Sequence, residues 1–178
     1  MCIRDRFQIK AVSAIEEELD RILKTRKQSR IQTIADMVIR NYGHLDEKIN
    51  FYQNLRSLED YVSRHSLNVA ILCAMITHVM NIRREEQYHT VCAALLHDMG
   101  KLKKHEDVYF GAPYSREDAI RNCETQEEAY SVIEDAFATE GPAIRRICQQ
   151  AAGKQLDLFP EEGKESRYKM LELSLIHI

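Results

Sequence analysis

The stretch Ala-Ala-Leu-Leu-His-Asp-Met-Gly-Lys, residues 93–101, decides both the fold and the chemistry that we expect. It places His97 and Asp98 side by side at the end of an apolar run, and Gly100 and Lys101 follow directly. Imidazole and carboxylate groups are typical ligands of divalent transition metals. The stretch therefore predicts part of a metal site, with the charge of Lys101 beside it to meet a phosphate.

The segment before this stretch predicts a core helix over residues 61–80, because its apolar residues recur at helical spacing. We expect a buried stripe formed by Leu72, Ile76 and Val79. His65 lies two turns before Leu72 on the same side of the helix. It is the partner that a His-Asp pair would need to complete a metal site.

A second core helix is predicted over residues 85–99. Ala93 and Ala94 lie on a narrow face beside His97, and such small side chains let another helix approach closely. We expect this approach to bring His97 within reach of His65. Gly100 is expected to end the helix in the left-handed conformation that glycine tolerates best.

The N-terminal part of the chain is also expected to be helical. Apolar spacing predicts one long helix or two consecutive helices over residues 7–40, ending near Gly43, and a short helix over residues 44–58. Residues 103–113 are expected to form a loop. Since no strand pattern competes anywhere, the predicted class is all-α.

Three helix-start signals follow in the C-terminal part. Ser115 has the spacing of an N-cap, Thr125 opens a capping box, and Pro142 can occupy the first position of a helix. We expect the helix that begins at Thr125 to end near residue 138, and the helix that begins at Pro142 to end near residue 152. Residues 153–166 are polar and are expected to form a loop.

Composition agrees with one domain that has a real core, because 44% of the 178 residues are hydrophobic and 30% are charged. No apolar run approaches the roughly 20 residues of a membrane helix, and no secretory signal is present. We therefore expect a cytoplasmic protein without a membrane segment. The net charge of −3 is small, and the basic residues are interleaved with acids, so a nucleic-acid polymer is not expected as a partner.

The cysteines are expected to be small buried thiols. Cys73, Cys92, Cys123 and Cys148 form no C-x-x-C pair, and each lies in a helical pattern beside apolar residues. This arrangement favours thiols in a reducing compartment over a metal or disulfide framework.

The two ends, residues 1–6 and 173–178, are expected to be sequencing-adapter scars. DNA strings that encode the two hexapeptides are nearly reverse complements of each other in different frames. An adapter read inward from both ends of a DNA fragment produces this relation, and the string resembles the transposase adapter of sequencing libraries. We therefore exclude both ends, and His177 with them, from the expected fold, and we expect the domain to be cut at both ends.

His65, followed by His97 and Asp98, resembles the first metal ligands of the HD-domain phosphohydrolase superfamily. The residues around His65, Tyr-Val-Ser-Arg-His-Ser-Leu-Asn-Val-Ala over 61–70, are similar to the start of the HD-GYP subfamily, the cyclic di-GMP phosphodiesterases of bacterial signalling. The resemblance implies an HD-type helical bundle over residues 58–172, after a helical lead-in over residues 7–57.

The resemblance further implies that His65, His97 and Asp98 hold one or two divalent transition metal ions: Fe, Mn, Zn or Ni. Asp98 and Lys101 are then the catalytic residues. Asp98 helps to position a hydroxide, and Lys101 contacts the substrate phosphate. The implied substrate is a phosphorylated small molecule, such as a nucleotide or a cyclic dinucleotide, and the implied reaction is hydrolysis of its phosphodiester.

The chain also departs from the HD-GYP pattern. It has no later His-His-Glu, Asp-Gly or Gly-Tyr-Pro segment, and no histidine lies between His105 and His177. The superfamily's last ligand, an aspartate, has no assignable match, because Asp118, Asp135 and Asp157 fit helix-start or surface positions better. Two functions therefore stay open: a phosphohydrolase, which we favour for the parent protein although this chain alone can be inactive, and a non-catalytic HD-like signalling or binding module.

Overall fold

The computed structural model describes residues 3–45, 58–102 and 115–157. This part of the chain is all-α, as predicted, and contains no strand. Its elements are α1 (Ile3–Thr25), α2 (Ile31–Tyr42), α3 (Leu58–Val79), α4 (Arg84–Leu96), the 3₁₀ helix η1 (Met99–Leu102), α5 (Arg116–Tyr130), α6 (Ile133–Phe137), the 3₁₀ helix η2 (Ala138–Glu140) and α7 (Gly141–Asp157).

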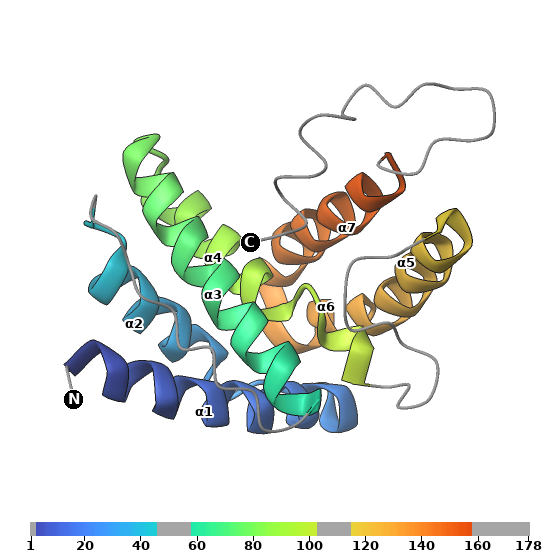
Figure 1. Ribbon diagram of the computed structural model, residues 1–178, viewed down its shortest axis with the longest axis horizontal. Helices are drawn as coiled ribbons and strands as arrows, with labels where there is room; N and C mark the ends of the chain where they lie inside the picture. The colour runs from blue at the N-terminus through green and yellow to red at the C-terminus, as the bar shows by residue number, and fades with distance from the viewer. Residues whose placement is uncertain (1–2, 46–57, 103–114, 158–178) are drawn as a thin grey trace.

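The centre of the bundle is α4, which packs against α2, α3 and α7 (Figure 1). Every side chain of its last two turns is buried, from Val91 to Leu96. Here α7 also packs closely on α4, since the Cys148 thiol of α7 lies 3.6 Å from the Ala93 carbonyl oxygen. His97 and Asp98 therefore follow directly after a well-packed, buried segment of α4.

The helix that carries His65, α3, begins and ends close to the predicted limits, but the prediction of its buried stripe was wrong. Ile76 and Val79 are 54% and 71% exposed, and Leu72 is only half-buried. The buried positions are mostly small or branched and follow a different stripe: Val62, Ser63, Ser66, Leu67, Ala70, Ile71 and Ala74. Small side chains on this face let α1 and α4 pack close to α3, so apolarity alone does not identify the inner face.

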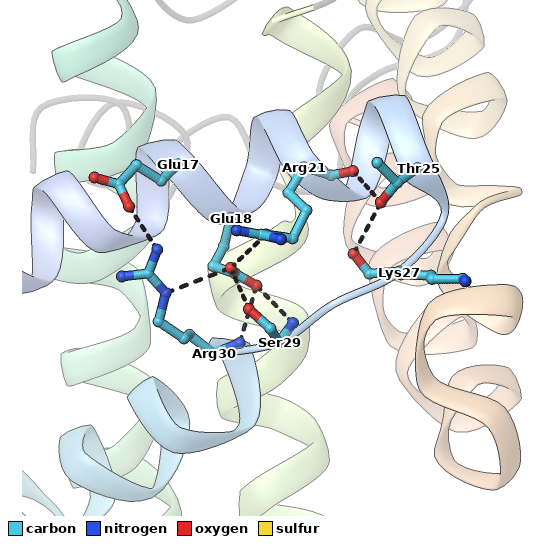
Figure 2. A network of polar contacts seen from close by, with 7 residues as sticks. All are labelled: Glu17, Glu18, Arg21, Thr25, Lys27, Ser29 and Arg30. Carbon is cyan, nitrogen blue, oxygen red and sulfur yellow. Dashed lines mark hydrogen bonds and ion pairs between the residues drawn. The ribbon is translucent and has the colours of Figure 1, made fainter.

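The N-terminal segment forms two helices, the second of the predicted alternatives, and a buried carboxylate stabilises the turn between them (Figure 2). Glu18 of α1 accepts hydrogen bonds from the backbone N–H groups of Ser29 and Arg30, at 2.8 and 2.9 Å. It also accepts from the Ser29 hydroxyl at 2.8 Å and from Arg21 Nε at 3.0 Å. Arg30, the N-cap residue of α2, makes no side-chain cap, and Glu18 holds the backbone just before the first turn of α2 from the preceding helix.

In the C-terminal part, α5 begins as predicted, since the Ser115 hydroxyl accepts from the backbone N–H of Asp118 at 3.1 Å. The prediction of a new helix at Thr125 was wrong, because α5 continues through it to Tyr130. Inside the helix, the Thr125 hydroxyl donates instead to the Arg121 carbonyl at 2.8 Å. This local bond satisfies the hydroxyl without ending the helix.

The last described helix, α7, has Pro142 in its first turn, as predicted. It continues to Asp157, so Gly153 is helical and its prediction as part of a loop was wrong. Gly43 follows the last residue of α2 as its C-cap, which confirms the predicted end.

Several predictions lie outside the described residues. They concern the short helix over most of residues 44–58, the loop over 103–113 and the remainder of the loop after α7. Residues 173–178, predicted to be an adapter scar, also lie outside, whereas residues 3–6 at the other end form the first turn of α1.

The cysteines Cys73, Cys92, Cys123 and Cys148 are free thiols on four different helices; Cys92 and Cys148 are buried, as predicted, whereas Cys73 and Cys123 are only partly buried. Burial raises the pKa of Cys92 to about 12, which leaves the thiol protonated and unreactive at neutral pH. None of the described helices combines the length and apolarity that a membrane span requires.

Candidate metal centre

Three side chains of the predicted site come together where α3 passes the end of α4. His65 comes from α3, and His97 and Asp98 lie in the turn between α4 and η1. One ligand atom of each lies within 4.8 Å of the others. The Nε2 atoms of His65 and His97 lie 3.6 and 3.7 Å from the same oxygen, Asp98 Oδ2. The predicted approach of His65 to His97 is therefore present, with ring centroids 5.1 Å apart.

The orientation of His97 is set by the backbone around it. Its Nδ1 lies 2.8 Å from the Ala94 carbonyl oxygen, and because a carbonyl can only accept, Nδ1 carries the hydrogen of this bond. In the neutral ring, Nε2 then has a free lone pair that faces Asp98. The Tyr130 hydroxyl of α5 also donates to the His97 carbonyl oxygen. Both contacts hold the ring in a position suited to metal ligation.

His65 is the most exposed member of the group, since 37% of its side chain is accessible. Its ring lies parallel to that of Tyr61, one turn earlier on α3, with centroids 5.8 Å apart and an interplanar angle of 1°. Partial burial lowers the pKa of His65 to about 4, which the charge of Asp98 only partly opposes. At neutral pH the imidazole is therefore uncharged, the form that binds metals.

Asp98 is buried, with only 3% of its side chain exposed, and both of its oxygens have partners. Lys101 Nζ donates to Oδ2 at 2.7 Å, and Gln126 Nε2 of α5 donates to Oδ1 at 3.2 Å. Burial would raise the pKa of Asp98, but electrostatic interactions with His97, Lys101 and His65, which act at the low pH where Asp98 titrates, and the bond from Lys101 outweigh it and lower this pKa to about 2. The carboxylate is therefore ionised at neutral pH.

Gly100 plays a different part from the one we predicted. It does not end α4 in a left-handed conformation; it lies buried inside η1. A Cβ atom at this position would lie 2.6 Å from Gln126 Oε1 and 2.8 Å from the Thr125 carbonyl oxygen. Glycine is therefore required because α5 packs directly on this backbone. The Gly100 N–H donates to Gln126 Oε1 at 2.9 Å.

Three residues around the site were not predicted: Tyr61, Gln126 and Tyr130. Tyr61 had a usable signal, because it lies one helical turn before His65 and so on the same face. Gln126 and Tyr130 had none, since they reach the site only through the packing of α5 on η1. Both residues lie roughly thirty positions after Asp98, and helical periodicity does not relate residues that far apart in the chain.

Other candidate ligands lie elsewhere. Asp118 accepts from Ser115 at the start of α5, and Asp135 pairs with Arg26 at 2.8 Å; both fit the predicted helix-start and surface positions. The side chain of Asp157 lies outside the described residues. Within the part of the chain that the structure describes, His65, His97 and Asp98 form the one group of three or more such residues that could hold a metal.

Comparison with known protein families agrees with this geometry. The model of the HD domain family matches residues 62–170, which is more than half of the chain and includes all three clustered residues. The chain belongs to the HD domain family. HD domains form a superfamily of metal-dependent phosphohydrolases. Among curated proteins and among solved structures, nothing matches the chain significantly.

The side chains of this HD domain fit a divalent metal. Two imidazoles and one carboxylate suit iron, manganese, zinc or nickel better than calcium. His97 Nε2 and Asp98 Oδ2 lie 3.7 Å apart, and His65 Nε2 lies 3.6 Å from the same oxygen, so neither imidazole forms a hydrogen bond with the carboxylate. A cation bound among the three groups would contact all of them. Exposure of His65 leaves the site accessible from solvent on one side.

Proposed function

We propose that this HD domain is a metal-dependent phosphohydrolase that acts as a phosphodiesterase on a nucleotide or a cyclic dinucleotide. The observation that carries the proposal is the convergence of two imidazole nitrogens on one buried carboxylate oxygen, Asp98 Oδ2. The similarity of residues 61–70 to the HD-GYP subfamily supports the substrate class and a role in bacterial signalling. A bound metal would supply an activated water and would polarise the phosphoryl group.

The roles of the chain's own residues follow from their positions. His65 and His97 would each bind through Nε2, because burial keeps His65 uncharged and the Ala94 carbonyl engages Nδ1 of His97, which leaves its Nε2 for the metal. Asp98 would contribute negative charge through Oδ2. Lys101 keeps a positive charge at the site, and we propose that it stabilises the charge of the substrate phosphate.

Hydrolysis of phosphodiesters, followed by the p-nitrophenol or the linear dinucleotide that is released, tests the proposal. Bis(p-nitrophenyl) phosphate and cyclic di-GMP would be incubated with the protein and Mn²⁺, and again with a chelator. We expect Mn²⁺-dependent turnover that falls more than about 100-fold in Asp98→Asn, beyond the effect typical of groups that only orient a ligand. Turnover that survives both the chelator and Asp98→Asn would contradict the proposal.

A second candidate is a non-catalytic HD module that binds a nucleotide or a protein partner. One observation favours it: both oxygens of Asp98 already have hydrogen-bond donors within the chain, Lys101 and Gln126. Such a site keeps its carboxylate satisfied without a metal. Saturable binding of cyclic di-GMP without turnover, at equal affinity with and without Mn²⁺, would support this candidate, and Mn²⁺-dependent turnover would exclude it.

A further inference from the structure

Gln126 lies in the middle of α5 and joins that helix to the candidate metal centre. Its side chain is buried, with 2% exposed, although glutamine is usually a surface residue. Its amide makes two hydrogen bonds: Nε2 donates to Asp98 Oδ1 at 3.2 Å, and Oε1 accepts from the Gly100 N–H at 2.9 Å. One side chain thus contacts both a candidate ligand and the backbone two residues after it.

The orientation of this amide is determined by chemistry. The Gly100 N–H can only donate, so it requires the oxygen end of the amide. The nitrogen end then faces Asp98 and donates to Oδ1, an oxygen that accepts this hydrogen bond. If the amide were flipped, a donor would face a donor and an acceptor would face an acceptor. Backbone and carboxylate therefore both select the same orientation of Gln126.

Gln126 and Lys101 hold the two oxygens of Asp98. Gln126 Nε2 donates to Oδ1, and Lys101 Nζ donates to Oδ2 at 2.7 Å. Oδ2 is also the oxygen that lies 3.6 and 3.7 Å from the Nε2 atoms of His65 and His97. The bond from Gln126, a residue of a different helix, therefore restricts rotation of the carboxylate and keeps Oδ1 directed toward α5.

We propose that Gln126 is a positioning residue of the metal centre, which holds Asp98 so that Oδ2 is directed at the metal. The inference rests on the proposed metal-dependent function. It assigns to α5 a part in the site that no sequence pattern indicates. It also explains why Gly100 has no side chain, because a Cβ atom there would displace the Gln126 amide.

The test compares two buried glutamines. Gln126→Met removes both hydrogen bonds and keeps nearly the same side-chain length. The matched control is Gln87→Met, because Gln87 is also buried and also joins two helices, donating to the Ala74 carbonyl at 3.2 Å and to the Thr77 hydroxyl at 3.1 Å. Gln87 precedes His97 by ten residues, about 15 Å along α4, so it does not act on the site.

Two quantities are measured for each protein: Mn²⁺ affinity by titration calorimetry, and the thermal midpoint without metal. We expect both variants to lower the midpoint, but only Gln126→Met to weaken Mn²⁺ binding, by about tenfold or more. The visible absorption of bound Co²⁺ should change in Gln126→Met and stay the same in Gln87→Met. A purely structural role for Gln126 predicts equal Mn²⁺ affinity and equal Co²⁺ spectra in all three proteins, and this result would overturn the inference.

Two controls keep the outcome clear. If Gln126→Met does not fold, Gln126→Asn takes its place, since the shorter amide keeps its polarity but cannot span both partners; unchanged Mn²⁺ affinity in this variant would overturn the inference. If the unaltered protein binds neither Mn²⁺ nor Co²⁺, the proposed function itself fails, and the inference fails with it. If the unaltered protein binds Mn²⁺ and the Gln126 variants bind it equally well, only the positioning role of Gln126 is contradicted, and the proposed function stands.

Discussion

Glu18 and Asp98 are both buried carboxylates with lowered pKa values, yet their surroundings differ in kind. Burial raises the pKa of Glu18, but the N–H groups of Ser29 and Arg30, the Ser29 hydroxyl and the charge of Arg21 outweigh this effect. These donors belong largely to the backbone at the start of α2. Glu18 therefore serves the fold, and its hydrogen-bonding capacity is used completely by the chain.

Asp98 is surrounded differently, because its donors are two side chains, Lys101 and Gln126, and not the backbone. The Nε2 atoms of His65 and His97 lie 3.6 and 3.7 Å from Oδ2 without forming hydrogen bonds to it, and one ligand atom of each of the three residues lies within 4.8 Å of the others. Burial and a low pKa therefore do not distinguish a structural acid from a metal ligand, whereas the identity of the neighbouring groups does.

The largest effect on stability is expected from Lys101→Met, which leaves Asp98 charged, buried and without its cation. Breaking such a pair should lower the free energy of unfolding by about 3 kcal/mol in the absence of metal. Mn²⁺ should restore more stability to this variant than it adds to the unaltered protein, because the ion replaces the lost charge. Chemical denaturation with and without Mn²⁺ measures both quantities. An equal Mn²⁺ effect in the two proteins would show that Asp98 does not bind the ion.

Glu18→Gln should have the next largest effect. It weakens several hydrogen bonds to a charged acceptor and should cost about 2 kcal/mol of unfolding free energy, with no change in Mn²⁺ affinity. The matched control is Glu17→Gln, since Glu17 pairs with Arg30 on the surface, where ion pairs contribute little. A loss of Mn²⁺ binding in Glu18→Gln would break the distinction between the two carboxylates.

The smallest effect concerns pH. The folded pKa of Glu18 lies below its ordinary value of 4.5, so its contribution to stability is fully present above pH 4.5 and is lost as the pH falls through the folded pKa. The difference in unfolding free energy between the unaltered protein and Glu18→Gln should therefore be constant from pH 5 to 7 and shrink below about pH 4.5. Asp98 should lose its contribution at lower pH, toward its pKa of about 2. A difference that grows on acidification would contradict the assignment.

The sequence was sufficient for the parts of the site that are local. His97, Asp98, Gly100 and Lys101 are neighbours in the chain, and periodicity placed His65 on a core helix, although the side of that helix predicted to be buried was wrong. The all-α class followed from the absence of any strand pattern. These features depend on spacing within one or two helices, which a single sequence displays directly.

The parts that failed depend on how helices pack. The buried face of α3 could not be chosen, because apolar residues occur around most of that helix and the small residues Ser63 and Ser66 decide the inner face. Gln126 and Glu18 contact residues that tertiary structure brings to them. Their types suggest surface positions, so only the packing of α5 on η1 and of α1 on α2 reveals their roles.

Calorimetric titration with Mn²⁺ tests whether Asp98 is a metal ligand and Glu18 is not; the proteins compared are the unaltered chain, Glu18→Gln and Asp98→Asn. We expect the unaltered chain and Glu18→Gln to bind Mn²⁺ with the same affinity. We expect Asp98→Asn to bind at least about 100-fold more weakly, because the charged ligand is lost. Equal binding by Asp98→Asn and the unaltered chain would contradict the assignment of His65, His97 and Asp98 as the metal centre.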